Sequence, residues 1–148
     1  MAELEATLRL LSSASDSLNK ASDSLNESIS QVEVALRSYN LGIAVWVEVE
    51  RDSVDPDRNI ENVIQLGYGK LDGKWGLLTS SYRNDAPDET WDEKFLREAS
   101  RHRRRAAIDK LPDLISKLVE EADKSAKATT VTAEKTRKIA ASLARKAK

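Results

Sequence analysis

The sequence predicts an α+β fold in which long amphipathic helices accompany a small antiparallel sheet. Three observations predict it: a heptad repeat near the N-terminus, an alternation of apolar and polar residues in the middle, and a return to helical periodicity in the second half. Charged residues make up 33% of the chain and aromatic residues only 5%. This composition favours one elongated domain that spans residues 1–148 and is completed by helical self-association, rather than a compact sphere.

A long N-terminal helix is predicted over residues 3–38, because no Gly or Pro interrupts the pattern there. Residues 14–20 and 21–27 repeat one heptad, identical but for its last residue. Apolar residues recur every seventh position, with others three or four positions away: Leu4, Leu11, Leu18, Leu25 and Val32, with Leu8, Ala14, Ala21, Ile29 and Leu36. Such a narrow seam packs helices lengthwise. We therefore expect a homo-oligomer, with a dimer as first choice and higher closed symmetry as second.

Residues 41–82 alternate apolar and polar positions, which predicts a three-stranded antiparallel meander. The first strand is expected to end near Glu50, and a polar loop is expected over residues 51–59. A small meander cannot stand alone, so the long helices must cover at least one of its faces.

The dipeptide Asp72-Gly73 predicts a two-residue hairpin turn that fixes the register of the second and third strands. The turn sets Tyr68 opposite Leu77 and Gly69 opposite Gly76, so three glycines share one face: Gly67, Gly69 and Gly76. A face without side chains admits a close neighbour, either a helix of the same assembly or a flat ligand.

A second helix is predicted over residues 90–126, because Thr90 and Glu93 have the spacing of a capping box. Pro112 is expected to kink or break this helix. The β-branched run at residues 128–132 predicts another break, followed by a basic, Ala-rich helix over residues 130–148.

The charges are unevenly distributed along the chain. Residues 1–62 carry 5 Lys and Arg against 12 Asp and Glu, whereas residues 101–148 carry 14 against 6. We expect the acidic N-terminal helix to lie beside the basic C-terminal one, within or between chains. The pI near 5.9, with no recognisable binding module, argues against nucleic acid as a partner.

Catalytic chemistry is not expected. The chain has no Cys and one His, so neither thiol catalysis nor a transition-metal site is predicted, and no cofactor is expected. His102 lies on the apolar stripe of its predicted helix, which favours a core residue over a general base. No carboxylates pair across a predicted cleft, so we assign no catalytic residue and do not expect an enzyme.

A cytoplasmic location is the simplest expectation, because no signal-peptide pattern and no run of about 18 apolar residues is present. A membrane is not an expected partner either. The C-terminal helix has Lys and Arg for a lipid surface but lacks large apolar anchors.

The densest candidate site is the run from Arg101 to Arg105. On a helix, four arginines form one stripe: Arg97, Arg101, Arg104 and Arg105. Guanidinium groups gathered in this way suit a carboxylate or a phosphate. That anion comes either from the protein itself, through Glu48, Glu50, Asp52 and the acidic N-terminal helix, or from an external ligand such as a nucleotide.

Two function hypotheses follow. The first is a non-enzymatic, homo-oligomeric, sequestering protein that captures a small anionic ligand, such as a nucleotide or a nucleotide-derived signal, between these arginines and aromatic side chains such as Tyr68 and Trp75. The second is a coiled-coil adaptor or inhibitor that grips a protein partner with its long helices, leaving the arginines to internal pairs.

Overall fold

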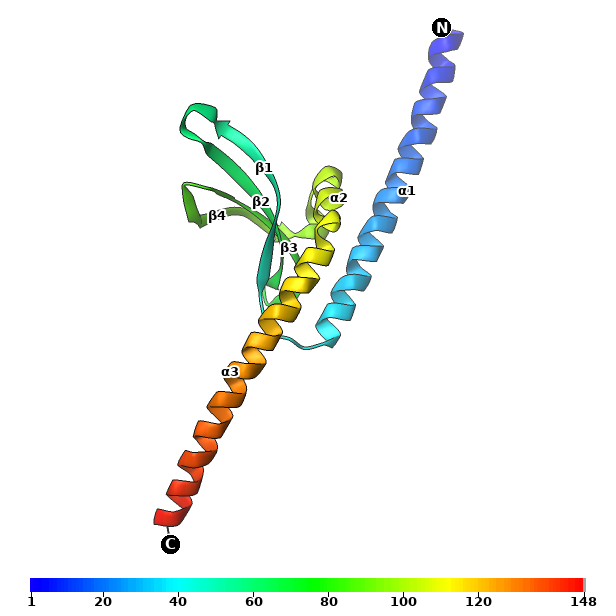
Figure 1. Ribbon diagram of the computed structural model, residues 1–148. Helices are drawn as coiled ribbons and strands as arrows, with labels where there is room; N and C mark the ends of the chain where they lie inside the picture. The colour runs from blue at the N-terminus through cyan, green and yellow to red at the C-terminus, as the bar shows by residue number, and fades with distance from the viewer. Residues whose placement is uncertain (148) are drawn as a thin grey trace.

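The computed structural model describes residues 1–147 and has an α+β architecture (Figure 1). A long helix is followed by four strands, a short helix and a second long helix. The elements are α1 (Ala2–Ser38), β1 (Val45–Asp55), β2 (Ile60–Leu71), β3 (Lys74–Arg83), β4 (Ala86–Phe95), α2 (Arg101–Asp109) and α3 (Leu111–Lys146), with single 3-10 turns η1 (Pro56–Arg58) and η2 (Leu96–Glu98).

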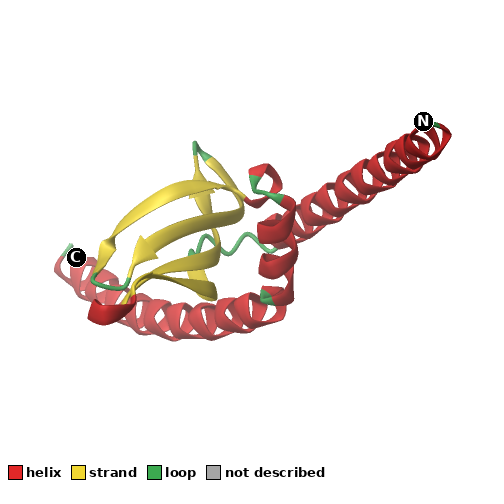
Figure 2. Ribbon diagram, turned by 90° about the horizontal axis from the view of Figure 1, so that it is seen from above, coloured by secondary structure: helices red, strands yellow, loops and turns green. Residues whose placement is uncertain are grey.

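The sheet is an antiparallel meander in the order β1-β2-β3-β4, and it is strongly curled (Figure 2). The hairpin between β2 and β3 has the predicted register, with Tyr68 opposite Leu77 and Gly69 opposite Gly76. Asp72 and Gly73 have φ values of 51° and 80°, the pair of positive angles that a type I′ turn requires. The predicted turn and register are therefore confirmed, whereas the number of strands is four rather than three.

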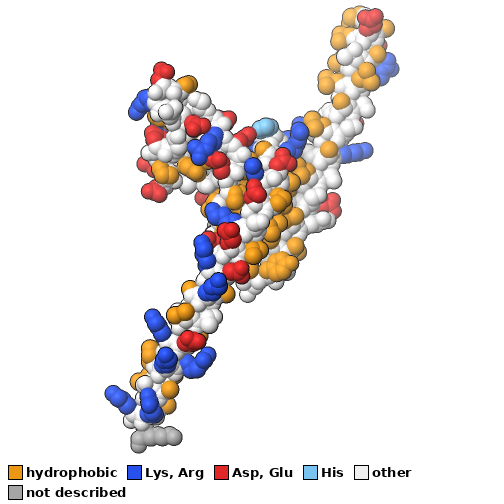
Figure 3. All heavy atoms as spheres, viewed as in Figure 1, with side chains coloured by type: hydrophobic (Ala, Val, Ile, Leu, Met, Phe, Trp, Pro, Cys, Tyr) orange, Lys and Arg blue, Asp and Glu red, His pale blue; other side chains and the backbone are white. Residues whose placement is uncertain are grey.

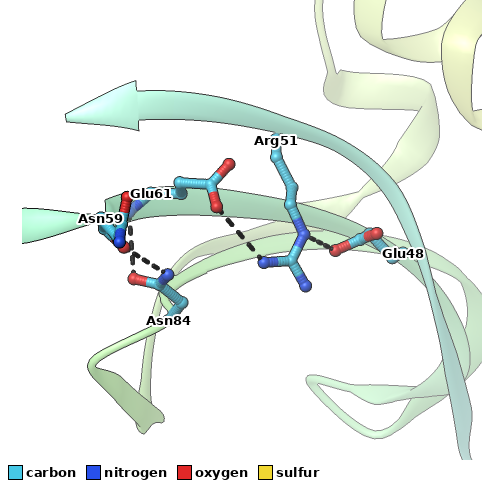
Figure 4. A network of polar contacts seen from close by, with 5 residues as sticks. All are labelled: Glu48, Arg51, Asn59, Glu61 and Asn84. Atoms are coloured by element: carbon cyan, nitrogen blue, oxygen red, sulfur yellow. Dashed lines mark hydrogen bonds and ion pairs between the residues drawn. The ribbon is translucent and has the colours of Figure 1, made fainter. Parts of the chain in front are cut away.

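The first strand is longer than predicted, because the polar segment expected as a loop continues β1 as far as Asp55. Polar contacts within β1 and between β1 and β2 accompany this segment (Figure 4). Arg51 pairs with Glu48 and lies 3.7 Å from a carboxylate oxygen of Glu61 on β2. Asn84 accepts a hydrogen bond from the Glu61 amide, which ties β2 to the turn after β3. Polar side chains are compatible with a strand here because the segment projects into solvent.

The predicted start of the second helix at Thr90 is wrong, because residues 86–95 form the edge strand β4. Trp91 lies opposite Ser81 of β3, and Phe95 lies opposite Leu78. Pairing with the free edge of β3 outweighs the local capping signal, and Trp91 and Phe95 are residue types common in strands.

Helix α2 begins instead after Ser100, whose hydroxyl accepts a hydrogen bond from the Arg103 amide. The chain is interrupted at Lys110, and Pro112 lies in the first turn of α3, where its missing N–H breaks no helical hydrogen bond.

The break predicted at residues 128–132 does not occur, since α3 runs without interruption from Leu111 to Lys146. Thr130, Thr132 and Thr136 each donate a hydroxyl hydrogen bond to the carbonyl four residues earlier, which satisfies these polar side chains within the helix. The predicted basic helix is thus the distal part of α3, and Lys148, its predicted end, lies outside the described residues.

The core lies between one face of the sheet and the helices. Its buried members come from the second half of α1, from β2 and β3, and from the start of α3: Ile29 and Leu36, Leu66, Tyr68 and Leu77, and Leu114 and Leu118. Val45 of β1, Leu96 of η2, Ala99, and Ala107 of α2 are also buried in it. Burial of these side chains fixes the second half of α1 and the start of α3 against the sheet.

The glycine-lined face of the hairpin is occupied from within the chain. The ring of Trp46 on β1 lies directly on Gly67, and the carboxylate of Glu33 on α1 approaches Gly76 so closely that a Cβ there would overlap it. The close approach that the glycines permit is therefore made by an aromatic ring of the neighbouring strand and by a helix side chain.

Candidate functional site

Arg97, the first of the four predicted site arginines, pairs with Glu33, a carboxylate that is only 2% exposed. Its Nε lies 2.8 Å from one carboxylate oxygen, and the other oxygen accepts a hydrogen bond of 2.9 Å from the backbone amide of Leu77. Because both oxygens of Glu33 have a donor, this buried charge is compensated and connects α1 to β3 and η2.

Arg104 is 5% exposed and bonds to α1 through both terminal nitrogens. Its Nη1 lies 2.6 Å from the side-chain oxygen of Asn26, and its Nη2 lies 2.7 Å from the hydroxyl of Ser22. The Nε of Arg104 has no hydrogen-bond partner among the described residues. Arg101, one turn earlier, donates to the side-chain oxygen of Asn19 at 3.2 Å.

The three acceptors Asn19, Asn26 and Glu33 are seven residues apart, so they occupy one row along α1. The heptad repeat therefore carries a polar row next to its apolar seam, and this row receives Arg101, Arg104 and Arg97 in turn. Sequence reasoning missed the row because it followed only the apolar positions, although the recurrence of Asn in the repeat was a visible signal.

Of the internal anions that the sequence suggested, the N-terminal helix contributes Glu33, whereas Glu50 approaches His102, with 3.4 Å between its Oε2 and the imidazole Nε2. His102 is exposed, so its predicted core position is wrong. The cause is that α2 begins only at Arg101 and does not continue the stripe predicted from Trp91. Arg105 is also exposed, and with His102 it lines a shallow hollow that also has apolar lining residues such as Leu25 and Ile108.

The aromatic members of the predicted site lie elsewhere. Tyr68 is 2% exposed inside the core, and Trp75 packs beside it with ring centroids 5.5 Å apart. Burial raises the pKa of the Tyr68 hydroxyl, an effect that Arg37 partly offsets and Glu33 reinforces. Both rings are packing partners of α1, and the structure does not bring them together with Arg105 in one cavity.

A second candidate site is formed by the parts of the two long helices that extend beyond the sheet. We define the α1 arm as residues 2–21 and the α3 arm as residues 123–146; every residue in both arms is exposed. The arms point in opposite directions from the central body, so that the two ends of the described chain are far apart (Figure 1). At about 1.5 Å per residue, each arm is roughly 30 Å long or more.

The α1 arm carries an exposed leucine stripe, formed by Leu4, Leu8, Leu11 and Leu18. At 3.6 residues per turn this stripe continues the face that carries Ile29 and Leu36, both of which pack into the core. The face of α1 that is buried in the body therefore continues along the arm as a solvent-exposed face.

The α3 arm has the same relation to its own buried face. The face of Leu114 and Leu118 continues into a stripe of mostly small and β-branched residues, which ends near the large side chains of Ile139 and Leu143. The other members of the stripe are Ala126, Thr129, Ala133, Thr136 and Ala140. The remaining surface of this arm is strongly basic, and Figure 3 shows its Lys and Arg side chains along the lower helix.

An apolar hollow of about 370 Å³ lies where α3 leaves the body. It is lined by residues of both long helices and of the segment after α1: Leu36, Tyr39, Leu41, Ile115, Leu118, Val119, Ala122 and Asp123. Apolar surface thus extends from the core along the root of the α3 arm (Figure 3).

No group of three or more His, Cys, Asp or Glu side chains within residues 1–147 is arranged to hold a metal ion. In the same residues, no helix has the length and apolar character needed to cross a membrane. The chain has no significant match to a protein-family model, a curated protein or a solved structure.

Proposed function

We propose that the protein is a non-enzymatic, self-associating interaction protein that works through its two helical arms. The observation that carries the proposal is that each arm extends a face that is buried in the body, yet every residue of both arms is exposed. A long exposed stripe of apolar and small side chains on a helix is typical of a surface that binds another helix.

The positions of the arginines favour this proposal over the capture of a small anion. Arg97, Arg101 and Arg104 already donate to α1, and an external phosphate would have to compete with these contacts. Ligand capture would then rest on the exposed Arg105, separated from the aromatic rings that a nucleotide base would need for stacking.

Hydrogen exchange in the α1 arm tests the proposal with two neighbouring substitutions. Leu11→Asp places a charge on the leucine stripe, whereas Leu10→Asp places the same charge on an equally accessible position about a quarter-turn away; the native side chains are 63% and 71% exposed. We expect the amides of the arm to exchange more slowly as protein concentration rises in the wild type and in Leu10→Asp, but not in Leu11→Asp.

Amides of the core strands provide the control, because neither substitution touches the body and their exchange is expected to stay unchanged. The proposal fails if exchange in the arm is independent of concentration in all three proteins.

A further inference from the structure

We propose that each arm pairs with the other arm of a second copy, so that the α1 arm of one chain lies antiparallel to the α3 arm of its partner. This inference rests on the proposed function and specifies which surfaces meet. It differs from the pairing of two N-terminal helices that a heptad repeat by itself suggests. Four features of the arms support it: side-chain size, charge, the order of the charges along each arm, and the directions in which the arms point.

The two stripes are complementary in size. The α1 stripe consists of leucines, whereas most of the α3 stripe consists of Ala and Thr. Large side chains from one helix fill the space that small side chains leave on the other, which allows close packing of the two backbones. Ile139 and Leu143 near the distal end of α3 extend this surface.

The charges of the two arms are also complementary. The α1 arm contains Glu3, Glu5 and Asp16 against Arg9 and Lys20, and two further acidic residues, Asp23 and Glu27, follow directly after the arm. The α3 arm contains seven basic side chains against Asp123 and Glu134: Lys124, Lys127, Lys135, Arg137, Lys138, Arg145 and Lys146. Pairing of two α3 arms would bring these basic groups together, whereas pairing of unlike arms brings opposite charges together.

The order of the charges selects the antiparallel direction. In an antiparallel pair, Glu3 and Glu5 at the start of α1 lie beside Arg145 and Lys146 at the end of α3. In a parallel pair they would lie instead beside the start of the α3 arm, where Glu120, Glu121 and Asp123 outnumber Lys124. Like charges along a helix pair oppose association, so the antiparallel direction is favoured.

A single two-fold axis allows both arms of each chain to pair at the same time. In Figure 1 both helices run from the N-terminal end of the molecule toward its C-terminal end, and their arms point in opposite directions. Rotation by 180° about an axis perpendicular to the helices reverses the second copy. Its α3 arm then lies beside the first α1 arm, and its α1 arm lies beside the first α3 arm. The two contacts are equivalent, and the assembly is closed as a dimer.

Cross-linking tests the pairing directly, because the chain has no cysteine and single cysteines can be introduced cleanly. Thr7→Cys marks the distal part of the α1 arm, Ser142→Cys the distal part of the α3 arm, and Ser125→Cys its root. Each experiment mixes two of these variants, one of them isotopically labelled so that links between chains can be recognised. A bismaleimide with a spacer of about 10 Å is the cross-linker. We expect Thr7→Cys to link to Ser142→Cys between chains, and we expect no links within either variant alone.

Other products identify other assemblies. Links between two Thr7→Cys chains indicate pairing of like α1 arms, and links from Thr7→Cys to Ser125→Cys indicate a parallel pair. Either product overturns this inference while the proposed function stands, because the arms still associate. If no pair links and hydrogen exchange in the arms is independent of concentration, the inference and the proposed function fail together.

Charge reversal provides a second test that does not depend on cross-linker geometry. We expect Glu3→Lys/Glu5→Lys and Arg145→Glu/Lys146→Glu each to weaken the dimer about tenfold, since two reversed pairs occur at each end. Mixing the two variants restores the affinity, because every arm pair in the mixed dimer joins opposite charges. The antiparallel arrangement is contradicted if neither variant on its own loses affinity, or if mixing the two variants does not restore it.

Discussion

Arg104 lies in a stretch of sequence that is typical of a ligand site, but it makes the contacts of a structural residue. The run of basic residues around it predicts anion binding, yet its guanidinium bonds to Ser22 and Asn26 inside the molecule. Arg105, the next residue, is exposed. The sequence indicated that the arginines share a stripe, but not which of them face α1, because the start of α2 depends on the edge strand that precedes it.

These contacts predict different costs for the two neighbouring arginines. Arg104→Ala removes charged hydrogen bonds from a buried site, and we expect it to lower the free energy of unfolding by about 2–4 kcal/mol. Arg105→Ala, the matched control, is expected to change it by less than about 0.5 kcal/mol. Urea denaturation measures both. Equal effects of the two substitutions would show that the internal contacts of Arg104 are not structural.

Asp92 gives a prediction for pH dependence. It lies 2.9 Å from Arg103 and 3.2 Å from Lys94. Burial acts to raise its pKa, but the hydrogen bonds from Lys94 and Arg103 together outweigh burial and lower the pKa below its ordinary value. A carboxylate with a lowered pKa stabilises the folded state above its ordinary pKa, near 3.8, and loses this contribution as pH falls through the lowered value.

We therefore expect Asp92→Asn to be less stable than the wild type at pH 7, by no more than about 1 kcal/mol because the pair is partly exposed. The difference should shrink below about pH 4 as the wild-type carboxyl becomes protonated. Urea denaturation as a function of pH measures it. A difference that persists unchanged into strong acid would mean that the Asp92 charge makes no contribution.

At the scale of elements, the parts with a strong local sequence pattern were predictable, whereas the edge strand β4 and the full length of α3 were not. The heptad repeat predicted α1, and Asp72-Gly73 predicted the hairpin and its register, because each signal is local and strong. Strand β4 was missed because its partner, the free edge of β3, is a tertiary feature. The continuity of α3 was missed because the hydroxyls of its threonines are satisfied inside the helix.

Helix α1 has an exposed part and a packed part, which two substitutions one heptad apart distinguish. Leu18 lies in the arm and is exposed, whereas Leu25 packs against the core. We expect Leu25→Asp to destabilise the monomer by about 2 kcal/mol or more, because it places a charge against apolar neighbours. Leu18→Asp is expected to leave monomer stability within about 0.5 kcal/mol and to weaken association instead.

Thermal unfolding at low protein concentration reports the stability of the monomer, and sedimentation at higher concentration reports association. A loss of stability in Leu18→Asp as large as that in Leu25→Asp would contradict the division of α1 into an arm and a packed part.

At the scale of the whole molecule, the uneven distribution of charge acquires a structural meaning. The sequence predicted that the acidic and basic ends of the chain would meet, within or between chains. In the structure, α1 and α3 both line the hollow that contains Leu36 and Leu118, and their charged arms point away from each other. A meeting of acidic and basic arms therefore requires a second chain, a conclusion that needed the directions of both helices and not only their sequences.

The mass of the wild-type protein in solution tests this account most directly. Sedimentation equilibrium over a dilution series is predicted to show a species of twice the 16.5 kDa chain mass that dissociates on dilution, with the same behaviour in Leu10→Asp and a single-chain mass in Leu11→Asp. A single-chain mass for the wild type at every concentration would contradict the account, because both arms would then remain exposed in solution.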